Sequence, residues 1–363
     1  MTKQAPKLLV MAGGTGGHIF PGVAVAKALE SEGWQIHWLG TAKRMEAEIV
    51  PQQGYPISFI NIAGMRNKGW KELIKLPFKL LQSLIQSIRV IRGINPDVVL
   101  GMGGYASAPG GVAAWLLGKP LVLHEQNAVA GMSNRYLSKI AKRVLCAFPN
   151  AFKISVGAKV VGNPLRKEMV ELEQVVSVQP TSSKKVLVVG GSLGAKIFND
   201  TVPSAMKQIQ QQHIHVWHQT GKGNEAEVQA RYHEHGLPEE RIKVTEFIDN
   251  MAEAYNWADI VVCRAGALTV SELAMAGKPA IFIPLPHAVD DHQTKNADYL
   301  VGRGAAKLIA QKDFNGTTLA QMLNSMFSSD TVVRNMSKAA LDAAHADATI
   351  KVAEACKELV ANG

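Results

Sequence analysis

Short apolar runs alternate with longer helix-like stretches along the whole chain. The runs are four or five residues long, rich in Val, Ile and Leu, and mostly do not alternate with polar residues. Such runs are typical of strands buried on both faces of a parallel sheet. Their alternation with helices predicts an α/β fold of doubly wound parallel sheets. The runs are residues 7–11, 35–39, 57–60, 97–101, 120–124, 143–146, 185–189, 214–218, 242–245, 259–263, 279–283 and 306–309.

The same pattern starts twice. Residues 9–17 read LVMAGGTGG and residues 186–194 read VLVVGGSLG, each typical of a strand, a glycine turn and the start of a helix. The 363 residues are enough for two domains that each bury a core. We predict one domain over residues 1–163 and a second over residues 164–341. The last helix, within residues 342–363, could belong to either half, including packing back on the first domain.

Glycine-rich turns follow four of the apolar runs, at residues 13–18, 101–106, 190–194 and 264–272. Glycine lets backbone N–H groups approach a phosphate at the positive end of the following helix. The first turn has more small residues than a turn needs, which favours a ligand-facing role over turn chemistry alone. In the third turn, Ser192 could donate to a phosphate or simply cap the helix.

The second glycine turn allows a different interpretation. Residues 101–106 read GMGGYA, which matches G-x-G-x-x-A, and Glu125 follows at the distance of a ribose-binding acid. A nicotinamide-dependent oxidoreductase is therefore an alternative. However, that fingerprint normally opens a domain, and here it lies on an internal strand, which disfavours the alternative.

The fourth glycine turn carries the chemistry of most interest. Residues 264–272 read RAGALTVSE, and they follow a buried strand. Thr269 is expected at the N-cap or in the first turn of a helix, with Glu272 one turn later on the same side. The helix start could bind a diphosphate while Glu272 binds a ribose diol. A capping box made by Thr269 and Glu272 explains the same spacing, so spacing alone does not decide.

Cysteine usage and segment lengths limit the cellular location. Cys146, Cys263 and Cys356 are far apart and have no metal-binding or redox spacing, so we expect buried, reduced thiols in a cytosolic protein. The start of the chain does not resemble a secretory signal. No apolar run reaches the roughly 18 residues of a membrane span.

Positive charge is concentrated in the first half of the chain. Residues 1–165 hold 19 Lys and Arg against 7 Asp and Glu, whereas residues 166–363 hold 20 against 23. Residues 65–92 (MRNKGWKELIKLPFKLLQSLIQSIRVIR) combine basic and apolar side chains with one acid, Glu72. This composition predicts contact with an anionic lipid surface, and the alternative is a helix packed on the sheet with a solvated basic face.

Both descriptions of this segment can hold together. We expect residues 81–91 to pack on the sheet, while the preceding part contacts lipid. Nucleic acid is disfavoured as a partner because the segment lacks interleaved aromatic residues for base stacking. The predicted membrane-contact residues are Trp70, Lys71, Leu73, Ile74, Lys75, Phe78 and Lys79.

Taken together, the motifs resemble the MurG family of bacterial GT-B glycosyltransferases over essentially the whole chain. The resemblance implies two Rossmann-like domains facing across a cleft, and transfer of N-acetylglucosamine from UDP-N-acetylglucosamine to the lipid-linked muramyl-pentapeptide (lipid I) with inversion, which forms lipid II of peptidoglycan. It also implies no cofactor, a peripheral position on the cytoplasmic face of the inner membrane, and partners among other cell-wall synthesis and division proteins. The matching residues are 13–22 (GGTGGHIFPG), 101–111, 124–127 (HEQN), 162–166 (GNPLR), 190–195, 247–249 (FID) and 264–272.

The same resemblance implies roles for individual residues. Glu272 matches the ribose ligand, while Phe247 and Ile248 match the uracil pocket. The pair His292-Gln293 stands where the family often has two glutamines, so the role of His292 is open. The implied substrate contacts are Thr15, Gly16, Gly17, Asn127, Arg166, Ser192, Phe247, Ile248, Ala267, Leu268, Thr269, Val270, Ser271, Glu272, His292 and Gln293.

The chemistry requires groups that stabilise the departing diphosphate and a base for the acceptor hydroxyl. Asp290 and Asp291 are adjacent and lack the spacing of an Asp-x-Asp metal site, so we expect no metal. Helix N-termini and cationic side chains would then meet the leaving charge. His18, at the tip of the first turn, is our candidate catalytic base, and the alternative is that it only orients a helix or an acceptor phosphate.

Overall fold

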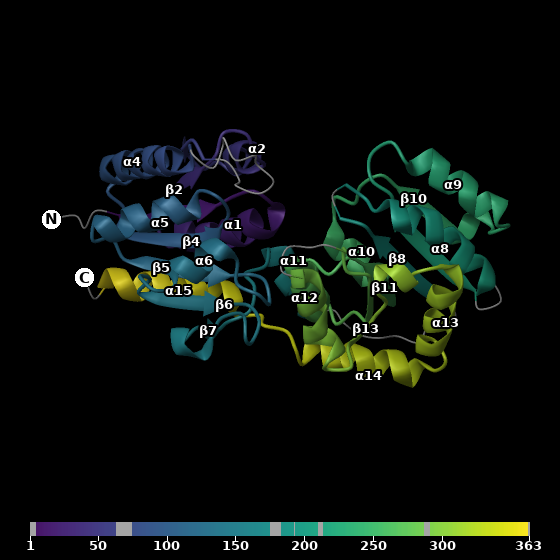
Figure 1. Cartoon of the computed structure of the whole chain (residues 1–363). Coiled ribbons are helices and arrows are strands. Elements are labelled where there is room, and N and C mark those ends of the chain that lie inside the picture. The colour runs from purple at the N-terminus through teal and green to yellow at the C-terminus, as the bar shows by residue number, and fades with distance from the viewer. Residues whose placement is uncertain are drawn as a thin grey trace. The chain divides into compact units, whose positions relative to one another are not determined.

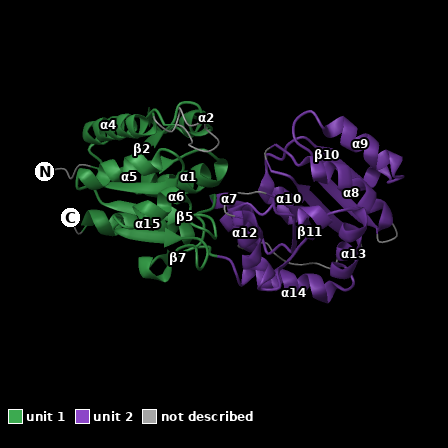
Figure 2. Ribbon diagram, viewed as in Figure 1, with its two compact units in different colours: residues 1–166, 345–363 green, residues 167–344 purple. Residues whose placement is uncertain are grey.

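The computed structural model describes residues 5–62, 75–174, 183–191, 193–209, 213–286 and 291–361. Helices cover both faces of two separate parallel sheets (Figure 1). The chain forms two compact units, residues 1–166 with 345–363 and residues 167–344 (Figure 2). The predicted fold class of two doubly wound parallel sheets is confirmed, and all twelve apolar runs form strands.

The first unit contains a seven-stranded sheet in the order β3-β2-β1-β4-β5-β6-β7. All its strand pairs are parallel. Its strands are β1 (Lys7–Ala12), β2 (Gln35–Gly40), β3 (Ile57–Phe59), β4 (Val98–Gly103), β5 (Leu121–Glu125), β6 (Arg143–Cys146) and β7 (Lys159–Val160). Its described helices are α1 (Gly16–Ser31), α2 (Glu46–Gln52), α4 (Leu76–Ile94), α5 (Ser107–Leu116), α6 (Met132–Leu137), α15 (Ala348–Ala361) and the 3₁₀ helix Ile154–Val156.

The second unit contains a six-stranded parallel sheet in the order β10-β9-β8-β11-β12-β13. Its strands are β8 (Lys184–Val189), β9 (Ile214–Gln219), β10 (Ile242–Thr245), β11 (Ile260–Cys263), β12 (Ala280–Phe282) and β13 (Ala306–Leu308). Its described α-helices are α7 (Lys167–Val170), α8 (Lys196–Gln208), α9 (Glu225–Glu234), α10 (Met251–Trp257), α11 (Ala267–Met275), α12 (His292–Val301), α13 (Gly316–Met326) and α14 (Asp330–Leu341). The 3₁₀ helices are Glu171–Gln174, Glu239–Arg241 and Gln311–Asp313.

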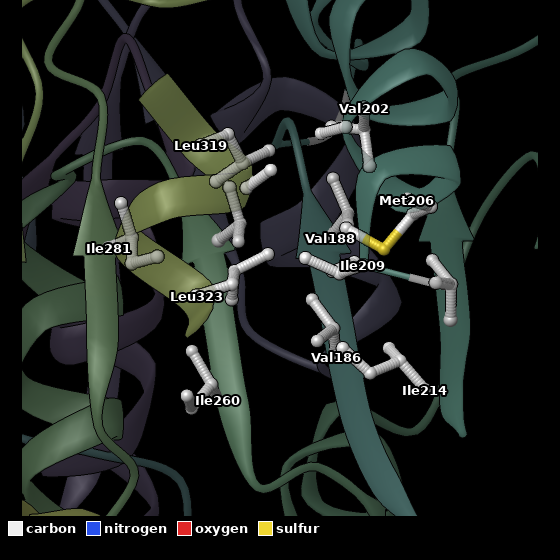
Figure 3. Packing of buried hydrophobic residues seen from close by; sticks show 14 of the residues in the cluster. Val186, Val188, Val202, Met206, Ile209, Ile214, Ile260, Ile281, Leu319 and Leu323 are labelled. Atoms are coloured by element: carbon white, nitrogen blue, oxygen red, sulfur yellow. The ribbon is translucent and has the colours of Figure 1, made fainter. Parts of the chain in front are cut away.

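Each sheet is buried on both faces. Along β1, Leu8 and Val10 join a cluster with residues of α1 and α15, whereas Leu9 and Met11 join one with α4, α5 and α6. This is the alternation expected of a strand between two helical layers. In the second unit, Val186 and Val188 of β8 pack against α8 and α13 (Figure 3). The three cysteines are buried and unpaired, and burial raises the pKa of Cys146 to about 11.

The last helix returns to the first unit. Val352, Ala353 and Cys356 of α15 belong to the same buried cluster as the apolar face of α1. Lys357 also pairs with Glu32 at 2.9 Å. This packing explains why the first unit contains both ends of the chain. No described helix is both long enough and apolar enough to cross a membrane.

Both sheets have a point where the strand order reverses. In the first unit it lies between β1 and β4, and in the second between β8 and β11. Ligands of doubly wound sheets bind outside the carboxyl ends of the strands at such a switch point. All four glycine turns found in the sequence follow these four strands, so the fold assembles them into two pairs.

Candidate functional site

The two glycine turns of the first unit touch each other at the β1/β4 switch point. Ala12 pairs with Gly103, so both strands deliver their turns to the same edge. Gly104 has a φ of +93°, and a Cβ there would overlap the carbonyl oxygen of Gly13. The close packing of two backbones therefore requires glycine at residue 104.

A buried carboxylate lies behind the first turn. Glu46 is 1% exposed. Its Oε2 accepts from Gly14 N–H at 2.8 Å, and its Oε1 accepts from the hydroxyl of Thr41 at 2.6 Å. The Gly14 amide is thus committed to the protein, and the nearby negative charge opposes anion binding at that position. Thr15, Gly16 and Gly17 follow at the start of α1, where N–H groups have no intrahelical partner.

His18 lies in the first turn of α1 and is partly buried. Its Nδ1 is 2.8 Å from Oε1 of Gln126, which follows β5. Gln126 in turn contacts His124, whose Nε2 donates to the carbonyl oxygen of Gly162 at 2.9 Å. The candidate base is therefore held by a hydrogen-bonded chain, and Gln126 is a residue that sequence reasoning did not select.

Glu125 holds the loop that carries Asn127. Oε1 of Glu125 accepts from the backbone and side-chain N–H groups of Asn127 at 3.0 and 3.2 Å. Oε2 accepts from Gly131 N–H and from Asn134 Nδ2 at 3.0 and 2.9 Å. Glu125 is 2% exposed, so it cannot serve as the ribose ligand that the nicotinamide alternative requires.

In the second unit, the glycine turn that follows β8 packs against the turn that follows the neighbouring strand β9. Gly194 has a φ of +73°, and a Cβ there would overlap the carbonyl oxygen of Thr220. The turn after β8 is therefore packed against the turn after β9. Gln219, at the end of β9, accepts from Gly190 N–H after β8 at 3.2 Å and donates to Glu246 O after β10 at 3.1 Å, so it joins the turns on either side of it. Ser192 lies outside the described residues.

The turn after β11 begins helix α11 at Ala267, with Gly266 as N-cap and no side-chain cap. Thr269 is thus in the first helical turn, and the capping-box alternative is wrong because Thr269 is not the N-cap. Glu272 is partly buried, and its Oε2 accepts from the hydroxyl of Tyr255 at 3.1 Å. Tyr255 of α10 was not predicted, because its position beside Glu272 depends on how two separate helices pack together.

The remaining residues around α11 differ in exposure. Leu268 and Ser271 are partly buried, and Val270 is buried; the Ser271 hydroxyl donates to Ala267 O at 3.1 Å. After β10, Phe247 is 58% exposed whereas Ile248 is 5% exposed. An exposed aromatic ring beside a buried aliphatic side chain can provide a stacking surface for a planar ring.

Two predicted residues open helix α12. His292 and Gln293 are partly buried in its first turn. Oε1 of Gln293 accepts from Leu285 N–H at 2.8 Å, which directs its NH₂ group as the remaining donor. Asp291 is the N-cap residue, and its carboxylate accepts from Thr294 at 2.7 Å. Among the residues that the structure describes, no cluster of three or more His, Cys, Asp or Glu could hold a metal.

Two arginines near the glycine turns have different environments. Arg166 belongs to the first unit, where its exposed guanidinium lies 5.6 Å from the ring centroid of Phe20 on α1. Arg264 of the second unit donates to the carbonyl oxygens of Ile283 and Pro284 at 2.9 and 3.2 Å. Burial lowers the pKa of Arg264, but these bonds keep it as a structural cation beneath the turn.

The predicted membrane segment is described from Lys75 onward; Trp70, Lys71, Leu73 and Ile74 lie outside the described residues. Lys75, Phe78 and Lys79 are exposed at the start of α4, with Phe78 75% exposed. Residues 81–91 pack on the first unit through one face of α4, where Ile91 is buried and Leu84 and Ile88 pack against the same cluster. Leu81 and Ile85 lie on the other face and remain exposed.

Comparison with known proteins gives consistent matches. Residues 8–146 match the glycosyltransferase family 28 N-terminal domain and residues 185–352 match the glycosyltransferase family 28 C-terminal domain. The chain is 55% identical over 99% of its length, and 94% of the relative's, to a protein of Colwellia psychrerythraea named UDP-N-acetylglucosamine--N-acetylmuramyl-(pentapeptide) pyrophosphoryl-undecaprenol N-acetylglucosamine transferase. A protein of the same name from Shewanella amazonensis is 57% identical, with 97% of this chain and 98% of the relative covered. The crystal structure of Acinetobacter baumannii MurG matches with a TM-score of 0.83 and 39% identity over 97% of this chain and 99% of that one.

Proposed function

The chain belongs to glycosyltransferase family 28, and we propose that it transfers N-acetylglucosamine from UDP-N-acetylglucosamine to lipid I, which forms lipid II of peptidoglycan. The observation that carries this proposal is the identity above 50% to relatives named for that reaction over nearly the whole chain. The two switch points supply a physical basis, because each brings together glycine turns and polar side chains.

Most of the donor contacts are assigned to the second unit. Glu272 accepts hydrogen bonds from the ribose hydroxyls, with Tyr255 holding its carboxylate in place. The first N–H groups of α11, at Ala267, Leu268 and Thr269, face the diphosphate, where the helix dipole favours negative charge. Val270, Ser271 and Ser192 complete this group of predicted contacts.

The planar and sugar ends of the donor have separate contacts. Phe247 offers a surface on which uracil stacks, beside Ile248. Gln293 donates from its NH₂ group to a sugar hydroxyl, since its oxygen accepts from Leu285. His292 and Arg166 are assigned to the donor through the resemblance, and their individual contacts are part of the proposal.

The reaction is a single displacement with inversion. An acceptor hydroxyl oxygen forms a bond to the anomeric carbon as the bond from that carbon to the diphosphate oxygen breaks, and its electron pair leaves with UDP. His18 takes the hydroxyl proton as general base. Thr15, Gly16, Gly17 and Asn127 are assigned to sugar or acceptor groups around it.

The departing diphosphate is stabilised without a metal in this proposal. The N-terminus of α11 and the glycine turn after β8 present backbone dipoles that need no reorganisation during the reaction. The carboxylate of Asp291 is instead hydrogen-bonded to Thr294 at the start of α12.

A lipid-linked acceptor would account for the basic and apolar residues of the segment 65–92. Helix α4 leads into β4, so its N-terminus lies at the carboxyl edge of the first sheet, the same edge that carries His18. Lys75, Phe78 and Lys79 are exposed there. We infer that they contact anionic lipid at the cytoplasmic face of the inner membrane, where other cell-wall synthesis and division proteins would meet the enzyme.

One assay tests the function directly. UDP release from UDP-N-acetylglucosamine is measured with and without a polyprenyl-diphosphoryl muramyl-peptide. Release that requires this acceptor is expected. Release with a small-molecule acceptor alone, or epimerisation of the donor without transfer, would assign the chain to a different reaction of the same fold.

A further inference from the structure

Three side chains and one backbone carbonyl form a continuous hydrogen-bonded chain in the first unit. His18 Nδ1 lies 2.8 Å from Gln126 Oε1, Gln126 Nε2 lies 3.1 Å from His124 Nδ1, and His124 Nε2 lies 2.9 Å from Gly162 O. Gln126 is 1% exposed and His124 is 0% exposed. Because the inner members are shielded from solvent, their proton positions depend on the partners inside the protein.

Two backbone carbonyls fix the direction of this chain. The Gly162 oxygen can only accept, so His124 Nε2 must carry a proton. Burial lowers the pKa of His124 to about 4, which leaves the ring neutral at pH 7 with an acceptor at Nδ1. The nitrogen of the Gln126 amide is 3.2 Å from the His124 carbonyl oxygen, so the NH₂ group faces His124 and the oxygen faces His18.

We propose that Gln126 and His124 are positioning residues that hold neutral His18 in the tautomer with its proton on Nδ1 and its lone pair on Nε2. The proposal rests on the proposed role of His18 as general base and extends it to residues that do not touch the substrate. A base at Nε2 needs that lone pair directed away from Gln126, toward the acceptor.

The same hydrogen-bonded chain also stabilises His18 once it has accepted the proton. When Nε2 accepts the hydroxyl proton, the imidazolium donates from Nδ1 to Gln126 Oε1 as a charge-assisted hydrogen bond, which is stronger than the neutral one. Gly103 supports the ring from another side, since a Cβ at this glycine would lie only 3.0 Å from Cε1 and Nδ1 of His18. The ring is thus held between backbone and amide oxygen.

The tautomer can be measured without substrate. Imidazole ¹⁵N–¹H correlation spectra of the full-length protein, with His18 assigned from a His18→Gln sample, are expected to show a protonated Nδ1 and an unprotonated Nε2 at high pH. In Gln126→Met the acceptor is lost, so both tautomers should appear. In Gln126→Glu an acceptor oxygen still faces His18, so the Nδ1-protonated form should be restored there, while the donor to His124 is lost.

Kinetics of the same variants separate positioning from folding. For Gln126→Met we expect kcat to fall on the order of 10- to 100-fold, the effect of losing one hydrogen bond to a charged group. The KM for UDP-N-acetylglucosamine should change less than about 2-fold, because the donor contacts are assigned to the other unit. Tyr55→Phe is the matched control, since it removes a hydrogen bond to Glu30 in the same unit and should leave kcat unchanged.

Two results would overturn the positioning role. One is a wild-type His18 that carries its neutral proton on Nε2, which decides the matter even where a variant fails to fold. The other is a folded Gln126→Met protein with wild-type tautomer and kcat. Failure of the proposed function is distinguishable, because it appears as a wild-type protein with no acceptor-dependent UDP release or as a His18→Ala variant with normal kcat.

Discussion

The two switch points share a backbone arrangement and differ in their side chains. At the β1/β4 edge the carboxylates Glu46 and Glu125 are buried and bound by the protein's own donors, and a histidine chain ends at His18. At the β8/β11 edge the carboxylate Glu272 is partly buried beside a helix N-terminus. In the proposed function, the turns of the first unit therefore serve proton transfer and those of the second unit bind the nucleotide diphosphate. Function depends on the side chains placed at the turns, not on the fold.

The largest expected effect comes from removing His18, the proposed base. His18→Ala should lower kcat on the order of 100- to 10,000-fold while the KM for UDP-N-acetylglucosamine changes little. Steady-state UDP release with saturating acceptor measures both parameters. Near-normal turnover would contradict a catalytic role for the β1/β4 edge, because that edge would then only bind the acceptor.

The second largest expected effect tests the β8/β11 edge, to which most of the donor contacts are assigned. Glu272→Gln keeps the size of the side chain and removes its charge, so each ribose hydroxyl loses a charged acceptor. We expect the KM for UDP-N-acetylglucosamine to rise on the order of 10- to 100-fold, corresponding to about 1.5–3 kcal/mol. Calorimetric titration with UDP checks the same contact without the acceptor.

Tyr255→Phe provides the graded comparison for Glu272. It removes the hydroxyl that donates to Glu272 and leaves the carboxylate, so its effect on UDP affinity should be smaller. UDP affinity that is equal to wild type in Glu272→Gln would contradict the ribose assignment.

Both units contain a buried neutral histidine, which predicts a shared sensitivity to acid. Burial lowers the pKa of His124 to about 4 and that of His218 to about 3, below the ordinary value of 6.5. Below about pH 6.5 the native state therefore binds fewer protons than the unfolded chain. The contribution of the two neutral histidines to the free energy of unfolding is fully present above about pH 6.5, and it is lost as the pH falls toward the folded pKa values. At pH 5 each histidine should lower the free energy of unfolding by about 2 kcal/mol.

A variant can separate the two units in this experiment. His218→Gln keeps a hydrogen-bond partner for Tyr232 and removes the titrating group. Urea unfolding at pH 5 and pH 8 should show a smaller acid loss for the second unit in this variant and no change for the first. An acid loss that stays the same in His218→Gln would exclude His218 as its source.

Sequence patterns predicted the sheets well because buried parallel strands need uninterrupted apolar runs. The strand β7 was missed, since two residues, Lys159 and Val160, are too few to form a recognisable run. The sequence left Thr269 at either the N-cap or the first turn of its helix, and the structure places it in the first turn with Gly266 as the N-cap. Local patterns place elements but not their terminal residues.

Within the site, sequence supplied the turns and the structure supplied their partners. His18 and Gln126 are 108 residues apart, and Gly14 and Glu46 are 32 apart, so neither pair has a local signal. Glu125 was a candidate ribose ligand only in the disfavoured nicotinamide alternative, and its four hydrogen bonds to the following loop and α6 exclude that role. Such pairings depend on strand order, which no single turn motif encodes.

The smallest expected effect per substituted residue concerns the lipid surface beside the first edge. Lys75→Gln with Lys79→Gln removes two exposed charges at the start of α4 and should weaken binding to anionic vesicles about 5-fold for each lysine, from about 1 kcal/mol per charge. Lys153→Gln with Lys159→Gln is the matched control, because these lysines are also exposed on the first unit but lie away from α4. Cosedimentation with phosphatidylserine-type vesicles at low salt should distinguish the two pairs. Equal weakening by both pairs would mean that general positive charge, and not this helix, attracts the protein to the membrane. The exposure of the apolar residues Phe78, Leu81 and Ile85 would then need another explanation.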